Sequence, residues 1–416
     1  MQEAKRAFGE GYVAAQAAHE RTRDWLLRYW PWSILYCLFA ALLLTIDDPR
    51  VYRWYCYVLL LAPFLLALRR ADVARLARSW VLCFSALYIA AVWLCLFWTP
   101  DMPASVFTHL ARRLIATFLF AVLTAWLVWR DDRHALRLAW TIAWAALLTA
   151  LVSLLFFPPS ERYLGRLMGW LWPNPNTAGA VFGVAAVAAG CAAAVARRLS
   201  WTLVYGTLAI FLAVCILLTG SRAAMAGVTA SFFAYVILQR AWRPLLALLA
   251  GVAAYAGTVA AGWIAPSLWL TRGDNGRFEL WSHFAPLASQ RLWLGYGLRN
   301  DLAFTIHNGL HTDDPHNMLL FTWFRFGLLG VLPWLALGAT MLVVGLRHWR
   351  RSGDMMSLAL SVFLLSHGLF ESMVPLQGAN WVWVYMWVPI GLAAGTELSL
   401  ARPGPGAPGG PRPGSP

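Results

Sequence analysis

The chain has 416 residues, of which 60% are hydrophobic and only 12% are charged, and its mean hydropathy is +0.59. A soluble globular protein has about 25% charged residues, so this composition excludes a soluble domain and indicates a polytopic membrane protein. The formal net charge of +14 is large enough to suggest nucleic-acid binding, but its distribution argues against that partner. The six cysteines lie inside apolar runs without a Cys-x-x-Cys pair, so we expect neither a disulfide framework nor a zinc site.

Residues 1–28 are polar and of mixed charge, and we expect them to form a cytoplasmic segment with a short surface helix. Apolar runs of spanning length follow, since a helix needs about 20 residues to cross ~30 Å of hydrocarbon. The tenth run is too long for one straight helix, and we expect a bend near Gly327 or Pro333. The sequence predicts an all-α membrane protein with about twelve spans. They are placed at 30–46, 51–68, 79–98, 108–129, 135–157, 176–196, 200–219, 222–239, 243–265, 316–346, 355–374 and 381–397.

The distribution of basic residues supports this arrangement. An even number of spans places both termini on one side, and if that side is the cytoplasm it carries 21 of the 33 Lys and Arg residues but only 9 of the 19 acids. Every short connection on that side is basic, as the positive-inside rule requires, so topology accounts for the charge and no nucleic acid is needed. The predicted segments are 1–28 (cytoplasmic), 29–265 (nine spans), 266–315 (a large outer loop), 316–397 (three spans) and 398–416 (a disordered cytoplasmic tail).

Charged and strongly polar residues are costly inside a membrane, and here they gather toward the outer ends of the spans. The members of this set are Arg112, Arg113, Asn174, Asn176, Ser221, Arg222, His316, Asn317, Arg325, His367 and Glu371. A solute transporter more often places such groups along a path near the midplane. The pattern therefore favours a site at the outer interface that meets a lipid-borne anion.

Several members of this set also have purely structural interpretations. Arg222 is either a snorkelling interfacial arginine or, beside Ser221 at a helix start, part of a phosphate site. Asn176 is predicted to be the N-cap of the sixth span. His367 and Glu371, four residues apart, are compatible with a satisfied structural pair. The roles of Arg112 and Arg113 stay open.

His316 follows a proline and stands at the water–lipid boundary, where a neutral imidazole can accept a proton near pH 7. The other histidines of the outer loop are predicted to be polar loop residues: His283, His307 and His311. Two adjacent carboxylates, Asp313 and Asp314, do not indicate a metal without a third ligand. We therefore expect a metal-independent site.

Four motifs, within a resemblance that runs from about residue 160 to 375, point to one family. His316-Asn317 followed after nine residues by Gly327-Leu-Leu-Gly330 resembles the His-(Asn/Ser/Gln)-x9-Gly-x-x-(Gly/Thr/Tyr) signature of the O-antigen ligases of bacterial lipopolysaccharide assembly. The wider ligase/polymerase superfamily has an Asn-Pro-Asn element, a Ser-Arg turn and an arginine at the start of its large outer loop. The segments similar to these are Asn174-Pro-Asn176, Thr219-Gly-Ser-Arg222 and Gly276-Arg277-Phe-Glu-Leu-Trp281. The outer face has no lysine, so any role that relatives give to lysine would fall to arginine here.

The resemblance implies a GT-C-like architecture and a glycosyltransferase of the bacterial inner membrane. It would transfer O-antigen from undecaprenyl pyrophosphate to a sugar hydroxyl of lipid A–core at the periplasmic face, with inversion and without cofactor or metal. Arg222 and Arg277 would bind the pyrophosphate through their planar guanidinium groups, and His316 would act as general base. Candidate supporting residues are Ser221, Asn174, Asn176, Asn317 and Arg325.

Three alternatives remain open at the level of sequence. O-antigen polymerases and protein O-oligosaccharyltransferases share these motifs, and the His-Asn pattern and the chain length favour a ligase. A transporter of a lipid-linked or small anion, with the outer loop as a gate, is the alternative from a different class.

Overall fold

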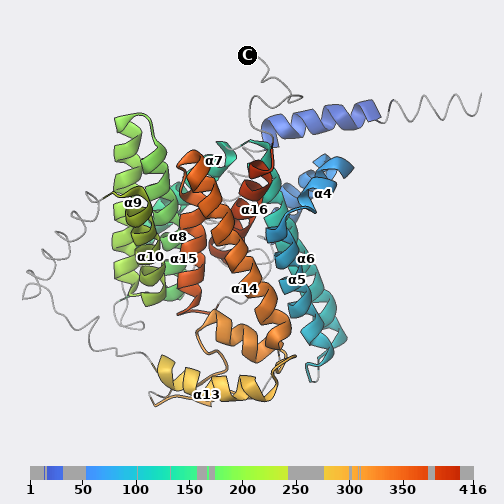
Figure 1. Cartoon of the computed structure of the whole chain (residues 1–416), viewed down its shortest axis with the longest axis vertical. Helices are drawn as coiled ribbons and strands as arrows, with labels where there is room; N and C mark the ends of the chain where they lie inside the picture. The colour runs from blue at the N-terminus through green and yellow to red at the C-terminus, as the bar shows by residue number, and fades with distance from the viewer. Residues whose placement is uncertain are drawn as a thin grey trace, which may run out of the picture.

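The computed structural model shows a bundle of long helices that run in roughly the same direction (Figure 1). Among the described residues, seven helices are long and apolar enough to cross a membrane. These are Trp80–Phe97 (α5, Trp80–Leu94, continued by η2, Cys95–Phe97), α6 (Ala104–Arg130), α7 (Arg133–Phe156), α8 (Pro175–Val195), α9 (Leu199–Thr219), α10 (Arg222–Gln239) and α14 (Met318–Ser352). The structure describes residues 14, 16–30, 53–100, 102–131, 133–156, 166–167, 174–241, 276–298, 302–307, 309, 311–372 and 380–402.

Residues 16–30 are also helical, and shorter elements account for most of the remaining described residues. Within the bundle they are Arg53–Ala67 (including η1, Cys56–Leu61, and α3, Ala62–Ala67), α4 (Arg70–Leu76), α15 (Met356–Gly368), η4 (Trp383–Trp387) and α16 (Val388–Leu400). Beyond one end of the bundle lie α13 (Arg277–Gln290) and a two-stranded antiparallel hairpin of β1 (Phe304–Thr305) and β2 (His311–Thr312). In Figure 1, α13 lies across the direction of the bundle helices, below α14.

The prediction of an all-α polytopic membrane protein is confirmed. Ten of the predicted spans coincide with helical segments, and the other two, 30–46 and 243–265, lie outside the described residues. The last span runs on to Leu400, past its predicted end at residue 397, because its apolar sequence continues in helical conformation. The total of twelve spans and the GT-C-like architecture remain predictions.

Close helix contacts in the bundle depend on small residues. A Cβ added to Gly391 of α16 would lie 2.6 Å from the Thr124 Cβ of α6, and one added to Gly395 would meet Val128 at the same distance. Gly183 of α8 is equally tight against Phe363 of α15. In a membrane, packing between helices replaces the hydrophobic effect as the main attraction, so this fit stabilises the bundle.

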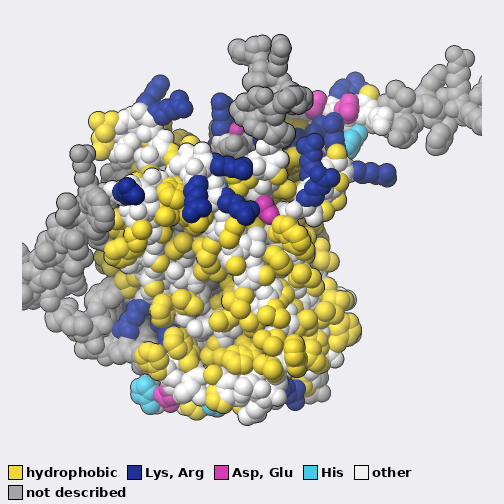
Figure 2. Space-filling view, in the orientation of Figure 1, with side chains coloured by type: hydrophobic (Ala, Val, Ile, Leu, Met, Phe, Trp, Pro, Cys, Tyr) yellow, Lys and Arg dark blue, Asp and Glu magenta, His cyan; other side chains and the backbone are white. Residues whose placement is uncertain are grey.

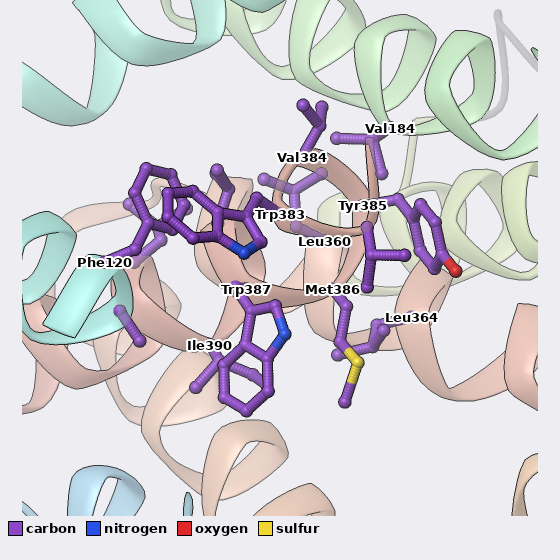
Figure 3. Close-up of a cluster of buried hydrophobic side chains, with 14 of the residues drawn as sticks. Phe120, Val184, Leu360, Leu364, Trp383, Val384, Tyr385, Met386, Trp387 and Ile390 are labelled. Atoms are coloured by element: carbon purple, nitrogen blue, oxygen red, sulfur yellow. The ribbon is translucent and has the colours of Figure 1, made fainter. Parts of the chain in front are cut away.

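Aromatic side chains fill the space between α6, α8, α15 and the start of the last span (Figure 3). Phe120 and Trp383 stack with their ring centroids 4.4 Å apart, and Trp383 donates a hydrogen bond from Nε1 to Thr117 Oγ1 over 3.1 Å. Trp387 and Tyr385 are buried in the same cluster. This cluster forms part of the buried core of the bundle.

The predicted bend in α14 occurs at Gly327, whose φ of 60° and ψ of −160° are not helical. The loop at residues 292–297 passes so close that a Cβ on Gly327 would lie 2.3 Å from the Trp293 backbone. Tyr296 and Gly297 donate N–H groups to the carbonyls of Phe324 and Arg325, and the loop accepts hydrogen bonds from the α14 backbone after the bend. The outer loop thus satisfies the backbone groups that the break in the helix leaves open.

The two ends of the bundle differ in charge. Figure 2 shows Lys and Arg side chains gathered at the end that carries α4, above a broad belt of hydrophobic side chains. The opposite end carries α13 and the start of α14 (Figure 1). This is the asymmetry expected of a membrane protein that obeys the positive-inside rule.

Candidate active site

His316 lies in a tight turn immediately before α14, two residues outside the membrane-spanning helix. Its φ of 49° is left-handed. This conformation costs a non-glycine residue about 1–3 kcal/mol and persists only where the surrounding contacts impose it. Here the Asp314 carboxylate accepts a hydrogen bond from the His316 backbone N–H over 2.8 Å, and Ser372 in turn donates to Asp314. The turn therefore holds the imidazole in one place.

Asn317 fixes the same turn from its other side. Its Oδ1 accepts a hydrogen bond from Leu320 N over 2.9 Å and so caps the N-terminus of α14. Its Nδ2 donates to the Leu369 carbonyl just after α15, over 3.0 Å. Asn317 thus ties the His316 turn to the segment that carries Glu371.

Glu371 is the centre of the site. Its Oε1 accepts a hydrogen bond from His316 Nδ1 over 2.9 Å, and its Oε2 accepts one from Asn176 Nδ2, also over 2.9 Å. The Arg277 guanidinium forms an ion pair with Oε2 at 3.7 Å. Three residues from α8, the start of α13 and the turn before α14 therefore meet on one carboxylate.

Arg166 extends this cluster toward the start of α10. It donates from one terminal nitrogen to Asn176 Oδ1 over 2.8 Å and from Nε to the Thr219 carbonyl over 2.5 Å. Thr219 begins the turn that leads to Arg222, and Gly179 of α8 packs directly against Ser221 in that turn. Arg222 therefore opens α10 beside a chain of contacts that leads through Asn176 to Glu371.

Arg277 is brought to the site by α13, of which it is the first residue. Gly276 before it has a φ of 71°, and a side chain there would collide with Ile306. Trp281, one turn along, donates from Nε1 to the Pro315 carbonyl over 2.9 Å. This hydrogen bond anchors α13 against the His316 turn and sets the position of the guanidinium.

The pKa shifts in the site follow from this geometry. Burial alone would lower the pKa of His316, but the hydrogen bond and negative charge of Glu371, together with Asp314, outweigh it and raise that pKa. Burial would raise the pKa of Glu371, but the hydrogen bond and charge of His316, with Arg277, hold it below its usual value. Burial also raises the pKa of Asp314. At neutral pH the carboxylate of Glu371 is therefore ionised and stabilises a proton on His316.

The tautomer of His316 follows from the same contact. An ionised carboxylate only accepts hydrogen bonds, so Nδ1 carries a proton and the neutral ring has its lone pair on Nε2. The side chain is 28% exposed. The arrangement is a carboxylate–imidazole pair near Arg277, and the basic nitrogen of the ring can accept a proton from a bound hydroxyl.

Several residues predicted from the sequence lie together and others do not. Asn176 and Arg277 reach Glu371 directly, as His316 does, whereas Ser221 is buried and serves as the N-cap of α10. The prediction that Asn176 caps the sixth span is wrong. Asn174 is the N-cap of α8 and accepts from the backbone of Asn176, because Pro175 occupies the first helical position and frees the Asn176 side chain for the site.

Arg325 points away from this cluster. It is 3% exposed and donates to the carbonyls of Gly297, Leu298 and Asp313, and it also pairs with the Asp313 carboxylate. Its guanidinium lies over the Phe324 ring, 5.0 Å from the centroid. These contacts hold the outer loop against α14.

The loop histidines pair with near neighbours. His307 Nδ1 lies 2.6 Å from Glu279 Oε2, His311 Nδ1 lies 2.8 Å from Thr305 Oγ1, and His283 stacks on Phe304. The described residues contain no cluster of three or more His, Cys, Asp and Glu side chains that would hold a metal ion. These histidines therefore belong to the loop rather than to the candidate site.

The sequence analysis does not identify Arg166, and it leaves open whether Glu371 belongs to the site or forms a structural pair with His367. In the structure neither ring nitrogen of the buried His367 has a hydrogen-bond partner among the described residues. The hydrogen-bonded partners of Glu371 lie 55 and 195 residues away. Arg166 carried a usable signal, because it is a cation in a connection predicted to lie on the outer side, close in sequence to the Asn174-Pro-Asn176 motif.

Comparisons with known proteins agree with the resemblance read from the motifs. Residues 207–335 match the family model described as O-antigen ligase, a stretch that contains Arg222, Arg277 and His316. The chain is also similar to an O-antigen ligase of Pseudomonas aeruginosa strain PAO1, with 29% identity over 174 residues. That alignment covers 42% of this chain and 43% of the relative, so less than half of the relative's length is matched.

Proposed function

Because the chain belongs to the O-antigen ligase superfamily, we propose that it joins O-antigen, delivered on undecaprenyl pyrophosphate, to a sugar hydroxyl of lipid A–core. The observation that carries this proposal is the meeting of His316 and Arg277 on Glu371. A base and a phosphate-binding cation thus stand side by side where the motifs of the family converge. The donor and acceptor rest on the family resemblance, and the roles of the residues rest on this geometry.

In the proposed reaction His316 acts through Nε2. The acceptor oxygen forms a bond to the anomeric carbon of the donor glycan while the bond from that carbon to the pyrophosphate oxygen breaks. The hydroxyl proton passes to Nε2, and the lipid pyrophosphate leaves with the bonding electrons. Glu371 holds the ring by Nδ1 and stabilises the imidazolium that forms. A single displacement of this kind inverts the anomeric centre.

Arginines neutralise the leaving group in this proposal. Arg277 lies at the Glu371 cluster, and Arg222 opens α10, whose N-terminus carries a partial positive charge. A guanidinium binds two phosphate oxygens at once, which suits a group that gains charge as the bond breaks. We add Arg166 as a third cation, since it links Asn176 to the turn before Arg222. An activated donor and these cations leave no step that requires a metal.

The proposed location is the inner membrane, with the site toward the periplasm. The α8–α9 connection contains Arg197 and Arg198, and the last turn of α14 contains Arg350 and Arg351. These residues lie at the far ends of helices that begin at the site. The positive-inside rule assigns that basic end to the cytoplasm and the His316 end to the opposite side.

One experiment separates this proposal from its alternatives. Purified full-length protein in liposomes is given lipid-linked glycan and lipid A–core, separately and together, and new glycosidic bonds are detected by mass spectrometry. A ligase forms product only when both are present. Elongation of the lipid-linked glycan alone would identify a polymerase. Transfer to an added acceptor protein would identify the protein-modifying branch, and movement of the lipid across the bilayer without bond formation would identify a transporter.

A further inference from the structure

A second group of basic residues surrounds a cavity between α6 and the Arg53–Ala67 helix. The cavity has a volume of about 630 Å³, within the range of small-molecule sites. None of its lining residues belongs to the His316–Glu371 cluster. The polar and aromatic residues that line it are Arg53, Trp54, Tyr57, His109, Arg112 and Arg113.

The cavity is unusually positive for its position. Three guanidinium groups face it, and the described residues place no carboxylate in an ion pair with any of them; Arg112 instead donates a hydrogen bond to His109 Nδ1 over 3.0 Å. Because a guanidinium only donates, the His109 ring accepts at Nδ1 and keeps a proton on Nε2 as a further donor. Like charges so close together repel one another, so an anion in the cavity would offset that cost.

The cavity lies toward the N-terminal end of α6. Arg112 and Arg113 follow the first residue of α6 by eight and nine positions, which is roughly 12–14 Å along a helix. Placing charge at that depth is costly unless it meets water or an anion. The indole of Trp54 is 65% exposed at the rim, as expected of tryptophan between lipid chains and water.

We propose that this cavity binds the phosphate of an anionic membrane lipid headgroup, with Arg53, Arg112 and Arg113 as its ligands. The lipid rather than free phosphate is the ligand because the cavity wall also contains Val106 and Leu110, and its rim carries the exposed Trp54. These apolar surfaces match the glycerol and upper acyl region of a lipid. The site is separate from the proposed transfer reaction, and its test does not depend on that reaction.

The test measures lipid binding to the full-length protein in detergent by native mass spectrometry. Phosphatidic acid, a phosphate monoester, is compared with zwitterionic phosphatidylcholine, and inorganic phosphate is added as competitor. We expect phosphatidic acid to bind and an equal concentration of inorganic phosphate to leave it bound. Failure of phosphatidic acid to bind above phosphatidylcholine would overturn the proposal. Equal affinity for inorganic phosphate would overturn the assignment to a lipid.

Variants place the binding in the cavity. The double substitution R112Q/R113Q removes two charge-assisted contacts and should weaken phosphatidic acid binding about tenfold or more. The matched control is R197Q/R198Q, which makes the same change in charge at exposed residues of the α8–α9 connection and should bind normally. If R112Q/R113Q does not fold, R53Q tests the same cavity from the other helix and should weaken binding several-fold. Unchanged binding in a folded cavity variant, or equal loss in the control, contradicts the proposal.

Discussion

Two arginine–carboxylate contacts lie near the start of α14, Arg325 with Asp313 and Arg277 with Glu371, and they differ in which polar atoms remain without a partner. Arg325 is buried and donates hydrogen bonds to three backbone carbonyls and to the Asp313 carboxylate. At the other contact, Glu371 gathers His316, Arg277 and Asn176, and the described residues leave His316 Nε2 without a hydrogen-bond partner. Arg325, whose donors have partners, stabilises the loop. His316 is held by Glu371 through Nδ1, and its Nε2 is left to accept a proton.

The Arg325 contact and the Glu371 contact contribute differently to stability and to reactivity. A buried polar group whose hydrogen bonds are all made stabilises the fold, and it cannot take part in a reaction without losing some of those hydrogen bonds. His316 is kept in a strained turn. The stability of the surrounding fold offsets that strain and holds the imidazole in a reactive geometry. We therefore expect substitutions at the two contacts to have opposite signatures, with loss of transfer at one and loss of stability at the other.

The largest effect is expected from His316→Asn. Asparagine tolerates the left-handed backbone of this turn, so the protein should fold, but it cannot serve as the base. Transfer should fall by about 10²–10⁴-fold, the usual contribution of general-base catalysis. The matched control is His307→Asn in the outer loop, a histidine whose side chain is 69% exposed and which should keep normal activity. His316→Ala should be equally inactive, and normal transfer by a folded His316 variant would remove it from the mechanism.

Glu371→Gln comes next and tests the pair rather than the base alone. Glu371 raises the pKa of His316, and the base works only when deprotonated, so activity should rise with pH through that pKa. Without the carboxylate the pKa falls, so the rising limb of the kcat/KM profile should move to lower pH. Loss of the charge-assisted hydrogen bond should also lower kcat by about 10–100-fold. An unshifted profile would show that Glu371 only supports the fold.

The sequence was informative about this site wherever the information is local. Apolar run length predicted ten described helical segments, and the excessive length of the tenth run predicted a bend near Gly327 or Pro333, which the structure places at Gly327. The contacts of Glu371 with His316, Asn176 and Arg277 could not be predicted from the sequence. They depend on how α8, α13 and α15 pack, and the sequence does not state which helices are neighbours.

Arg325→Gln probes the opposite side of the comparison. It leaves buried carbonyls and the half-exposed Asp313 with fewer partners, and unfolding free energy should fall by about 1–3 kcal/mol. Thermal unfolding in detergent measures this, with Arg291→Gln as the control because Arg291 is exposed and lies 4.8 Å from the Tyr296 ring centroid. In the protein that remains folded, transfer should be close to normal. A stable Arg325 variant with lost transfer would move this residue into the reaction.

The smallest effect is expected from Arg222→Lys, which tests whether pyrophosphate binding needs the planar guanidinium or only a positive charge. Arg222→Lys keeps the positive charge at the start of α10 but loses the planar fork that binds two phosphate oxygens. We expect about a tenfold loss of kcat/KM, equivalent to about 1.4 kcal/mol of transition-state stabilisation. Arg291→Lys makes the same chemical change away from the site and should be neutral. If Arg222→Lys is also neutral, the pyrophosphate needs only a point charge at this position, and bidentate binding then falls to Arg277 and Arg166, where the same substitution can be made.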